Sequence, residues 1–272
     1  MIQRSQLVRH DFAIRDLTVS AVRELSPSFR RVTLTGADLA GFTSLGAGDH
    51  SKVFFPDPAN GDYAVPALTE DGLRMPDAGT VIMRDYTPRD FRELPAELDI
   101  DFYLHGDDGP ASAWAARASE GDRLVVAGPR GSHLPPTGAA RVVLLGDETA
   151  LPAIARWIEI LPEPIEVFVF VELGNQSDAA YLDPDHVHRA RVVWLGKGDG
   201  GLERAIRSLD TAVIGDDTYF WGAGDSESLL PVRHYLRREL GLPVTQVKLT
   251  GYWKPGVEAL DHHAPIDPTD PD

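Results

Sequence analysis

Short runs of β-branched and aromatic residues, bounded by Gly, Pro or Asp, recur through the first half of the chain. This pattern is typical of β-strands. One helix is expected among them, at Ala111–Ser119, and the Asp-, Gly- and Pro-rich stretch Asp57–Pro76 is expected to be a loop. Six short strands with one helix predict a closed antiparallel barrel. The predicted strands are Leu17–Leu25, Phe29–Thr35, Lys52–Phe55, Thr80–Thr87, Leu98–Leu104 and Arg123–Ala127.

The pattern changes after Pro135-Pro136-Thr137-Gly138. Continuous apolar strands now alternate with helical segments, which predicts a parallel sheet covered on both faces. The expected strands are Arg141–Leu145, Glu166–Val171, Arg191–Leu195, Thr218–Trp221 and Gln246–Thr250, and the expected longer helices are Thr149–Leu161, Leu202–Leu209 and Ser226–Leu240. We therefore expect a barrel domain over residues 1–136 and an α/β domain over 137–258. The Pro- and Asp-rich residues 259–272 are expected to form a disordered acidic tail.

The amino-acid composition excludes several classes of function. The 272 residues include no cysteine, which excludes disulfides, thiolate nucleophiles and cysteine-ligated iron–sulfur clusters. A net charge of −16 opposes binding to nucleic acid or to anionic membrane surfaces. No apolar run has the length of a signal peptide or a membrane span, so we expect a soluble cytoplasmic protein without stable membrane association.

The segment Arg84-Asp85-Tyr86-Thr87 follows a β-branched run and is expected at the end of a strand. Its spacing suits a flavin dinucleotide. Arg84 would pair with a pyrophosphate oxygen, Tyr86 would pack on the isoalloxazine, and the Thr87 hydroxyl would reach a flavin nitrogen or carbonyl. An ordinary exposed strand with Arg and Tyr on one face would produce the same pattern.

A second segment, Leu104 to Ala116, is typical of a strand, a Gly-rich turn and a helix start. Pro110 suits the first helical position, and small residues behind it leave the backbone amides open to an anion. The alternative is a plain helix start with Trp114 as core filling. The FAD-binding candidates in this segment are His105, Gly109, Ala111, Ser112 and Trp114.

Taken together, these segments resemble the siderophore-interacting proteins, a branch of the ferredoxin–NADP reductase superfamily that reduces ferric siderophores with a flavin. The resemblance extends over about residues 15–256 in the same order. The matching segments are 50–56, 84–89, 105–115, 127–132, 146–153, 221–227 and 251–256. It implies an FAD-binding barrel, then a domain that binds NADPH or NADH. Trp253 follows an apolar strand at the end of the second domain and is expected to border the flavin, with core packing of the indole as the alternative.

The nicotinamide site is expected where the second domain's first strand ends, at Gly146-Asp147-Glu148-Thr149. No G-x-G-x-x-G fingerprint is present. Thr149 and backbone amides suit a pyrophosphate, whereas the carboxylates suit capping, and a simple helix cap is the alternative. Glu172 and Lys197 give opposite signals on NADH against NADPH. The NAD(P)H candidates are Gly146, Asp147, Thr149, Ala150, Ala223, Gly224 and Asp225.

An anionic acceptor needs a local basic pocket in so acidic a protein. The chain has only four lysines. Lys52 and Lys254 lie in family-like segments, and Lys248 lies three residues before the last of these segments. The alternative is that all three are ordinary surface charges. We expect these three, with Arg130, to bind the ferric siderophore. No metal site is expected, and His262-His263 is expected to be exposed rather than ligating.

The resemblance therefore implies an FAD-dependent NAD(P)H ferric-siderophore reductase that releases Fe(II). No catalytic residue beyond the flavin is required, because electrons pass to the chelated iron without proton transfer. Two alternatives remain open: a general reductase of flavins, quinones or electron carriers, and a non-catalytic flavin or ferric-chelate binding protein.

Overall fold

The structure is a computed structural model, and it describes residues 2–70, 72–105, 109–198, 200–258, 260–261 and 264–270. The chain forms two compact units. The N-terminal unit is Leu7–Leu134, and the C-terminal unit is Pro135–Asp272 together with Met1–Gln6. Among the described residues, no helix combines the length and the apolar character needed to cross a membrane.

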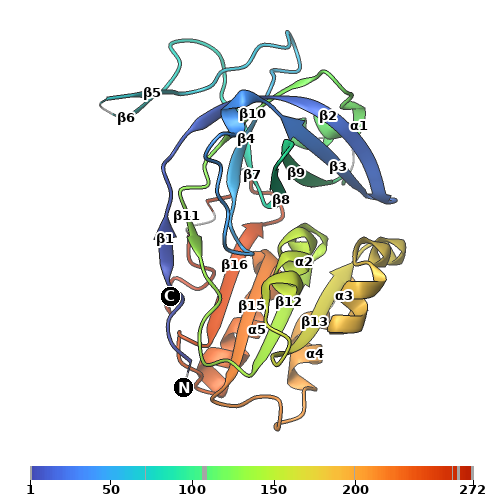
Figure 1. The fold of residues 1–272 in the computed structure, drawn as a ribbon. Coiled ribbons are helices and arrows are strands. Elements are labelled where there is room, and N and C mark those ends of the chain that lie inside the picture. The colour runs from blue at the N-terminus through green and yellow to red at the C-terminus, as the bar shows by residue number, and fades with distance from the viewer. Residues whose placement is uncertain are drawn as a thin grey trace. The chain divides into compact units, whose positions relative to one another are not determined.

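A curled antiparallel sheet forms the N-terminal unit (Figure 1). Its strand order is β7-β4-β10-β2-β3-β9-β8. The helix α1, Pro110–Arg117, packs against β4, β7 and β9. The strands are β2 (Ile14–Ser26), β3 (Phe29–Thr35), β4 (Ser51–Phe55), β7 (Ile82–Tyr86), β8 (Pro88–Glu93), β9 (Ala96–Tyr103) and β10 (Arg123–Ala127).

The predicted antiparallel domain is confirmed, but the sheet has seven strands rather than six. The additional strand is β8, which begins at Pro88, directly after Thr87. Its sequence lacks the usual strand residues, and proline is tolerated there because β8 lies at the sheet edge. The barrel is also not closed: within the described strands, no backbone pairing joins β7 to β8. Instead the ring of Tyr86 on β7 packs against Phe102 on β9, with ring centroids 4.5 Å apart.

Two faces of this sheet carry different residues. The inner face holds the apolar core, to which β9 contributes Leu98, Ile100 and Phe102. The intervening residues of β9, Asp99 and Asp101, point to the opposite face, as the two-residue period of a strand requires. A second, smaller cluster around Phe54, Val125 and Ala127 packs against residues of the 57–81 connection and of the stretch before β2.

Five shorter elements are also present among the described residues of this unit. Strands β1 (Leu7–Arg9) and β11 (Gly131–His133) pair antiparallel. The stretch predicted to be a loop contains a small hairpin of β5 (Ala67–Thr69) and β6 (Gly72–Arg74). A 3₁₀ turn, η1, spans Ala37–Leu39.

The C-terminal unit is the expected parallel α/β domain, with strand order β14-β13-β12-β15-β16 (Figure 1). Helices α4 and α5 cover the face that carries Val143 and Leu145. Helix α2 covers the other face, where Trp157 packs against Tyr219 and Trp221. The strands are β12 (Arg141–Asp147), β13 (Glu166–Leu173), β14 (Arg191–Gly196), β15 (Thr218–Asp225) and β16 (Val247–Trp253). The helical elements are η2 (Glu148–Ala150), α2 (Leu151–Ile160), η3 (Gln176–Tyr181), α3 (Pro184–Arg189), α4 (Gly201–Arg207), α5 (Ser226–His234) and the π-helical turn η4 (Tyr235–Glu239).

Residues 264–270 differ from the expected disordered tail. Asp270 forms a two-pronged pair with Arg237, at 3.0 and 2.9 Å, and Asp267 pairs with His234 at 3.0 Å and with Arg238. The tail's acidic residues, which suggested disorder, are neutralised by the basic end of α5 and η4. His262 and His263 lie outside the described residues.

Candidate functional site

Side chains alternate between the two faces of strand β7, so the predicted flavin residues Arg84 and Tyr86 lie on the same face. Arg84 lies opposite Val53 of β4, and Tyr86 lies opposite Ser51. Cross-strand partners share a face, and Val53 belongs to the inner core, so Arg84 and Tyr86 both lie on the inner side of the curled sheet. Thr87 follows the strand directly and is buried.

Tyr86 is half-buried and its ring is supported from within. Its centroid lies 4.5 Å from that of Phe102 and 6.2 Å from that of Phe55. Burial raises the pKa of the phenol well above its usual value, so Tyr86 is neutral over the physiological range. A neutral, core-backed ring of fixed orientation is a suitable platform for a flat heterocycle.

The start of α1 packs beside this strand. Its N-cap, Gly109, offers no side-chain cap, and Ala111 and Ser112 in the first turn are small and buried. The first amides of a helix have no partner within the helix, so this terminus suits an anion. A Cβ on Gly109 would lie 3.7 Å from Cε1 of His105, which places the imidazole at the same helix start. Residues 106–108 lie outside the described residues.

Trp114 differs from its predicted role in FAD binding. It is 5% exposed, and its ring packs 5.9 Å from Phe55 and 5.8 Å from Phe102. The spacing from Ala111 places Trp114 on the inner face of α1. The structure therefore assigns this indole to core packing rather than to an open surface for a cofactor.

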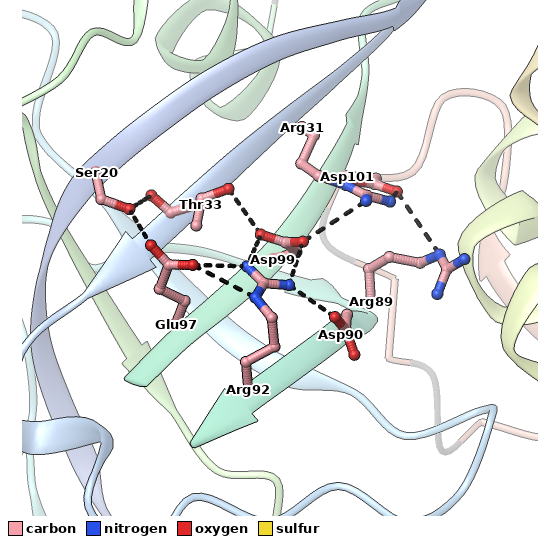
Figure 2. A network of polar contacts seen from close by, with 9 residues as sticks. All are labelled: Ser20, Arg31, Thr33, Arg89, Asp90, Arg92, Glu97, Asp99 and Asp101. Carbon is pink, nitrogen blue, oxygen red and sulfur yellow. Dashed lines mark hydrogen bonds and ion pairs between the residues drawn. The ribbon is translucent and has the colours of Figure 1, made fainter. Parts of the chain in front are cut away.

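A charged layer on the outer face of β9 holds the strand that follows the β7 motif (Figure 2). Asp101 accepts two hydrogen bonds from Arg31, at 2.7 and 2.8 Å, and lies 4.0 Å from Nε of Arg89. Asp99 accepts from both terminal nitrogens of Arg92, at 2.9 and 3.1 Å. Both carboxylates are buried, so the arginines fix β8 against β9 immediately after Thr87.

In the C-terminal unit, the predicted nicotinamide residues meet at the carboxyl ends of the parallel strands. The chain runs from β12 to β13 and β14 in one direction, and then returns to β15 and β16 on the other side of β12. Such a reversal creates a ligand crevice between the two central strands. Gly146 of β12 lies beside Ala223 of β15 at this point, and Gly224 lies beside Gly251 of β16.

Asp147 connects three of these strand ends. Its Oδ1 accepts from the backbone N of Thr149 at 2.8 Å and from the Thr149 hydroxyl at 2.5 Å. Its Oδ2 accepts from the backbone N of Asp225 at 2.8 Å and from Nε1 of Trp253 at 2.7 Å. Asp147 is 3% exposed, and burial raises the pKa of its carboxyl even though these four donors oppose that shift. The carboxylate thus orients the site, which is the capping role that the sequence favoured.

Two small residues at this edge are required by the packing of the chain itself. Gly224 has φ of +137°, and a Cβ there would lie 2.7 Å from Oδ2 of Asp147. A Cβ on Gly146 would lie 2.2 Å from the carbonyl oxygen of Ala223 and 2.7 Å from Cβ of Ala150. Ala150 is fully buried, so its role is packing beneath Gly146.

The sequence suggested that Glu148 caps or orients this segment, but it did not show that Glu148 meets Lys197. Glu148 is 0% exposed; its Oε1 accepts from the backbone N of Gly174 at 2.5 Å, and its Oε2 lies 2.9 Å from Nζ of Lys197. The same ammonium lies 5.5 Å from the ring centroid of Trp253. The only sequence signal was the place of Lys197 after the third strand of the unit.

Glu172 and Lys197 gave opposite indications on NADH against NADPH. In the structure, the Glu172 carboxylate is hydrogen-bonded within the protein. Its Oε1 accepts from the backbone N of Leu202 at the start of α4, 3.2 Å away, and burial raises the pKa of its carboxyl. A Cβ on Gly201 would lie 2.6 Å from the same oxygen. The carboxylate is therefore directed to α4.

The proposed lysine pocket is not assembled as expected. Lys52 pairs with Asp85 across two strands, at 3.0 and 3.2 Å, and Lys254 lies 3.7 Å from Glu227. Lys248 lies near the amino end of β16, six residues before Lys254, a separation of about 20 Å along a strand. The two lysines therefore do not form one compact cluster, and their joint contact with a chelate stays a prediction.

Lys52 and Arg130 are better placed with respect to each other. Lys52 pairs in register with Ala127, the last residue of β10, and Arg130 follows three residues later. The guanidinium of Arg130 lies 4.7 Å from the ring centroid of Phe12 and is exposed. This end of the N-terminal unit therefore carries two cations on adjoining segments.

Comparison with known proteins finds close similarity in sequence and in fold. A model of the siderophore-interacting FAD-binding domain matches residues 18–133, and a model of the siderophore-interacting protein matches residues 139–256. The NADPH-dependent ferric-chelate reductase of Escherichia coli K12 is 35% identical over 251 residues, which cover 91% of this chain and 96% of that protein. Ferric vibriobactin reductase ViuB of Vibrio cholerae is 33% identical over 243 residues, covering 88% of this chain and 89% of that protein. A siderophore utilization protein from T. fusca has a crystal structure that superposes with a TM-score of 0.87, at 37% identity, covering 95% of this chain and 99% of that one.

Proposed function

The chain belongs to the siderophore-interacting protein family, and on that premise we propose that it is an FAD-dependent reductase that uses NAD(P)H to reduce ferric siderophores to Fe(II). The observation that carries the proposal is that β7, with Arg84 and Tyr86 on one face, packs against α1, whose N-terminus has no side-chain cap. The chain is also similar over nearly its whole length to two ferric-chelate reductases. The proposed place of action is the cytoplasm, where NAD(P)H is supplied.

The hydrogen-bond donors of the N-terminal unit suit a flavin dinucleotide. Arg84 and the first amides of α1 would hold the pyrophosphate, while Tyr86, backed by Phe102, would support the isoalloxazine. Thr87 lies next to Tyr86 and would donate its hydroxyl to the ring system. When bound, FAD supplies the conversion of a two-electron hydride into single electrons. The charged layer of Asp99 and Asp101 keeps the chain after Thr87 in place.

The C-terminal unit fits a nicotinamide dinucleotide at the reversal between β12 and β15. The backbone at the ends of β12 and β15 would approach the pyrophosphate, because glycine and alanine there present no large side chain. The amide and hydroxyl of Thr149 already donate to Asp147, so Thr149 would have to exchange these bonds to contact a phosphate. Both carboxylate oxygens of Asp147 already accept hydrogen bonds from groups within the chain. Asp147 would therefore orient this edge rather than touch the phosphates. Trp253, at the end of β16, remains our candidate for the residue beside the flavin.

The acceptor would be an anionic or neutral ferric chelate. Long-range repulsion from the net charge of −16 would slow an anionic chelate, and the exposed Arg130 would supply positive charge locally. Lys52 would contribute only where the chelate displaces Asp85 from its ammonium. Hard oxygen chelators hold Fe(II) far less strongly than Fe(III), so reduction alone frees the metal. The protein needs no general acid or base for this step.

The test separates the two half-reactions under anaerobic conditions. Purified protein loaded with FAD is mixed with NADH or NADPH, and bleaching of the flavin absorption is followed. A ferric siderophore is then added to the reduced protein, and return of the oxidised spectrum is followed together with trapping of Fe(II). Absence of bleaching would leave only a binding protein. Bleaching without reoxidation by the chelate, but with reoxidation by quinone or free flavin, would indicate a general reductase.

A further inference from the structure

One carboxylate holds the indole of Trp253 by its edge. Oδ2 of Asp147 lies 2.7 Å from Nε1 of Trp253 and 2.8 Å from the backbone N of Asp225. The other oxygen is occupied by the two donors of Thr149. The end of β16 is therefore joined through one buried side chain to the ends of β12 and β15.

The neighbouring carboxylate acts on the face of the same ring. Glu148 is fully buried and pairs with Lys197, whose ammonium lies 5.5 Å from the Trp253 ring centroid. A cation above an indole face is attracted by its quadrupole. Consecutive residues 147 and 148 thus fix one indole in two directions, at its N–H edge and, through a lysine, at its face.

We propose that Asp147 is a positioning residue for reduction of the protein by NAD(P)H, and that it acts by fixing the orientation of Trp253. The inference rests on the proposed function, because it concerns the nicotinamide half-reaction. It predicts that the role of Asp147 lies in the hydrogen bond to the indole rather than in contact with the coenzyme. Trp253, only half-buried at the carboxyl edge of the sheet, would otherwise be free to rotate into the crevice.

The substitution Asp147→Asn tests the bond with little change in shape. The donors lie on opposite oxygens, two from Thr149 on one and two from Asp225 and Trp253 on the other. An amide has one accepting oxygen and an NH₂ group that donates, so the amide of this variant cannot satisfy both sides. Trp253→Phe keeps an aromatic ring and removes only the N–H and the second ring of the indole, so it removes the same bond from the other partner.

The first readout is the indole itself, in protein without NAD(P)H. In ¹⁵N-tryptophan-labelled protein, the indole N–H signal that disappears in Trp253→Phe belongs to Trp253. This signal should move upfield and exchange faster with solvent in Asp147→Asn. Asp217→Asn, the same chemical change beside the amino end of the sheet where Asp217 pairs with Arg141, should leave the signal in place.

The second readout is the limiting rate of anaerobic flavin reduction. Asp147→Asn and Trp253→Phe should each slow it by about 10–100-fold, the range for loss of a charge-assisted hydrogen bond, with a smaller change in the half-saturating NAD(P)H concentration. In the Trp253→Phe background, Asp147→Asn should add less than about threefold, because the two act through one bond.

The outcomes are distinguishable. Full additivity in the double variant, or a wild-type rate in Trp253→Phe, would overturn the inference while leaving the reductase proposal intact. If Asp147→Asn does not fold, an unchanged rate in Trp253→Phe still overturns the inference. Failure of the wild-type protein to be bleached by NAD(P)H would instead remove the proposed function, and the inference with it.

Discussion

Asp99 offers a direct measurement of what the charged layer on β9 contributes to the N-terminal unit. It is 4% exposed and accepts hydrogen bonds from Arg92 at 2.9 and 3.1 Å and from the Thr33 hydroxyl at 2.7 Å, with Arg31 3.6 Å away. In Asp99→Asn the side chain keeps its shape but loses its charge, and its NH₂ group faces a guanidinium. Arg92 retains Asp90 and Glu97 as partners, so its own charge is not left unpaired.

The expected cost is about 2–3 kcal/mol of unfolding free energy. Breaking a buried ion pair costs about 3–5 kcal/mol, and the partial exposure of Arg92 reduces this value. For a unit of this size we expect a fall of roughly 6–15 °C in its melting temperature. Calorimetry of the full chain gives the measurement, and the transition of the N-terminal unit is the one that rises when FAD is added.

The matched control is Asp16→Asn on β2. Asp16 makes an equally regular two-pronged pair with Arg123, at 2.8 and 2.8 Å, but both side chains are about half exposed. An exposed pair contributes at most about 1 kcal/mol, so this variant should melt close to the wild type. If Asp99→Asn loses no more stability than Asp16→Asn, the reasoning from burial is refuted.

The pH dependence gives a second check. Burial alone would raise the pKa of Asp99, but hydrogen bonds from Arg92 and Thr33 and the charge of Arg31 lower it below the usual value. A carboxyl with a lowered pKa stabilises the fold fully above its unfolded pKa, about 3.9, and loses that contribution as the pH falls through the folded value. The difference between wild type and Asp99→Asn should therefore be constant from about pH 6 to 8 and shrink below about pH 4.

Three single side chains give further predictions. Arg84→Ala should weaken FAD binding by about 1.5–3 kcal/mol, measured by flavin titration, and unchanged affinity would remove the pyrophosphate role. Trp114→Ala should cost about 3–5 kcal/mol of stability because the ring fills the core, and a loss below about 1 kcal/mol in denaturant unfolding would argue against that placement. His186 has its pKa raised, chiefly by its hydrogen bond to Glu159, so its stabilising contribution is complete below about pH 6.5 and is lost as the pH rises through the folded pKa. The stability advantage of wild type over His186→Gln should therefore decline between about pH 6 and 8, and a constant or growing advantage would contradict the pairing.

Features that depend on local spacing were predictable from the sequence. The two-residue period of a strand places Arg84 and Tyr86 on one face, and the change from isolated strands to alternating strands and helices separates the two units. Strand β8 was missed because its residues, Pro88–Glu93, are mostly charged and begin with proline, and only its position at the sheet edge makes that sequence acceptable.

Features that depend on distant partners were not predictable. Lys52 meets Asp85 33 residues away, and Lys197 meets Glu148 49 residues away, so the sequence shows the charges without showing that they are paired. The same limit applies to the tail, where Asp270 meets Arg237 across 33 residues. Trp114 was ambiguous for a different reason. An indole near the start of a helix can pack in the core or contact a ligand, and the sequence alone does not show which face of the helix carries it.

The C-terminal unit is built from two separate stretches of the chain, and this has a consequence for how the protein is made. Ile2 is buried, and Gln3 donates its backbone N–H to the carbonyl of Thr137, so these early residues belong with the strands that follow residue 135. On the ribosome, the first unit can close as soon as residue 134 has emerged, whereas residues 2–6 must stay available for a unit whose chain follows residue 134. A fragment that starts at Pro135 would lack this strap. A truncation that removes residues 2–6 therefore perturbs the unit that is synthesised last, and leaves the unit that is synthesised first intact.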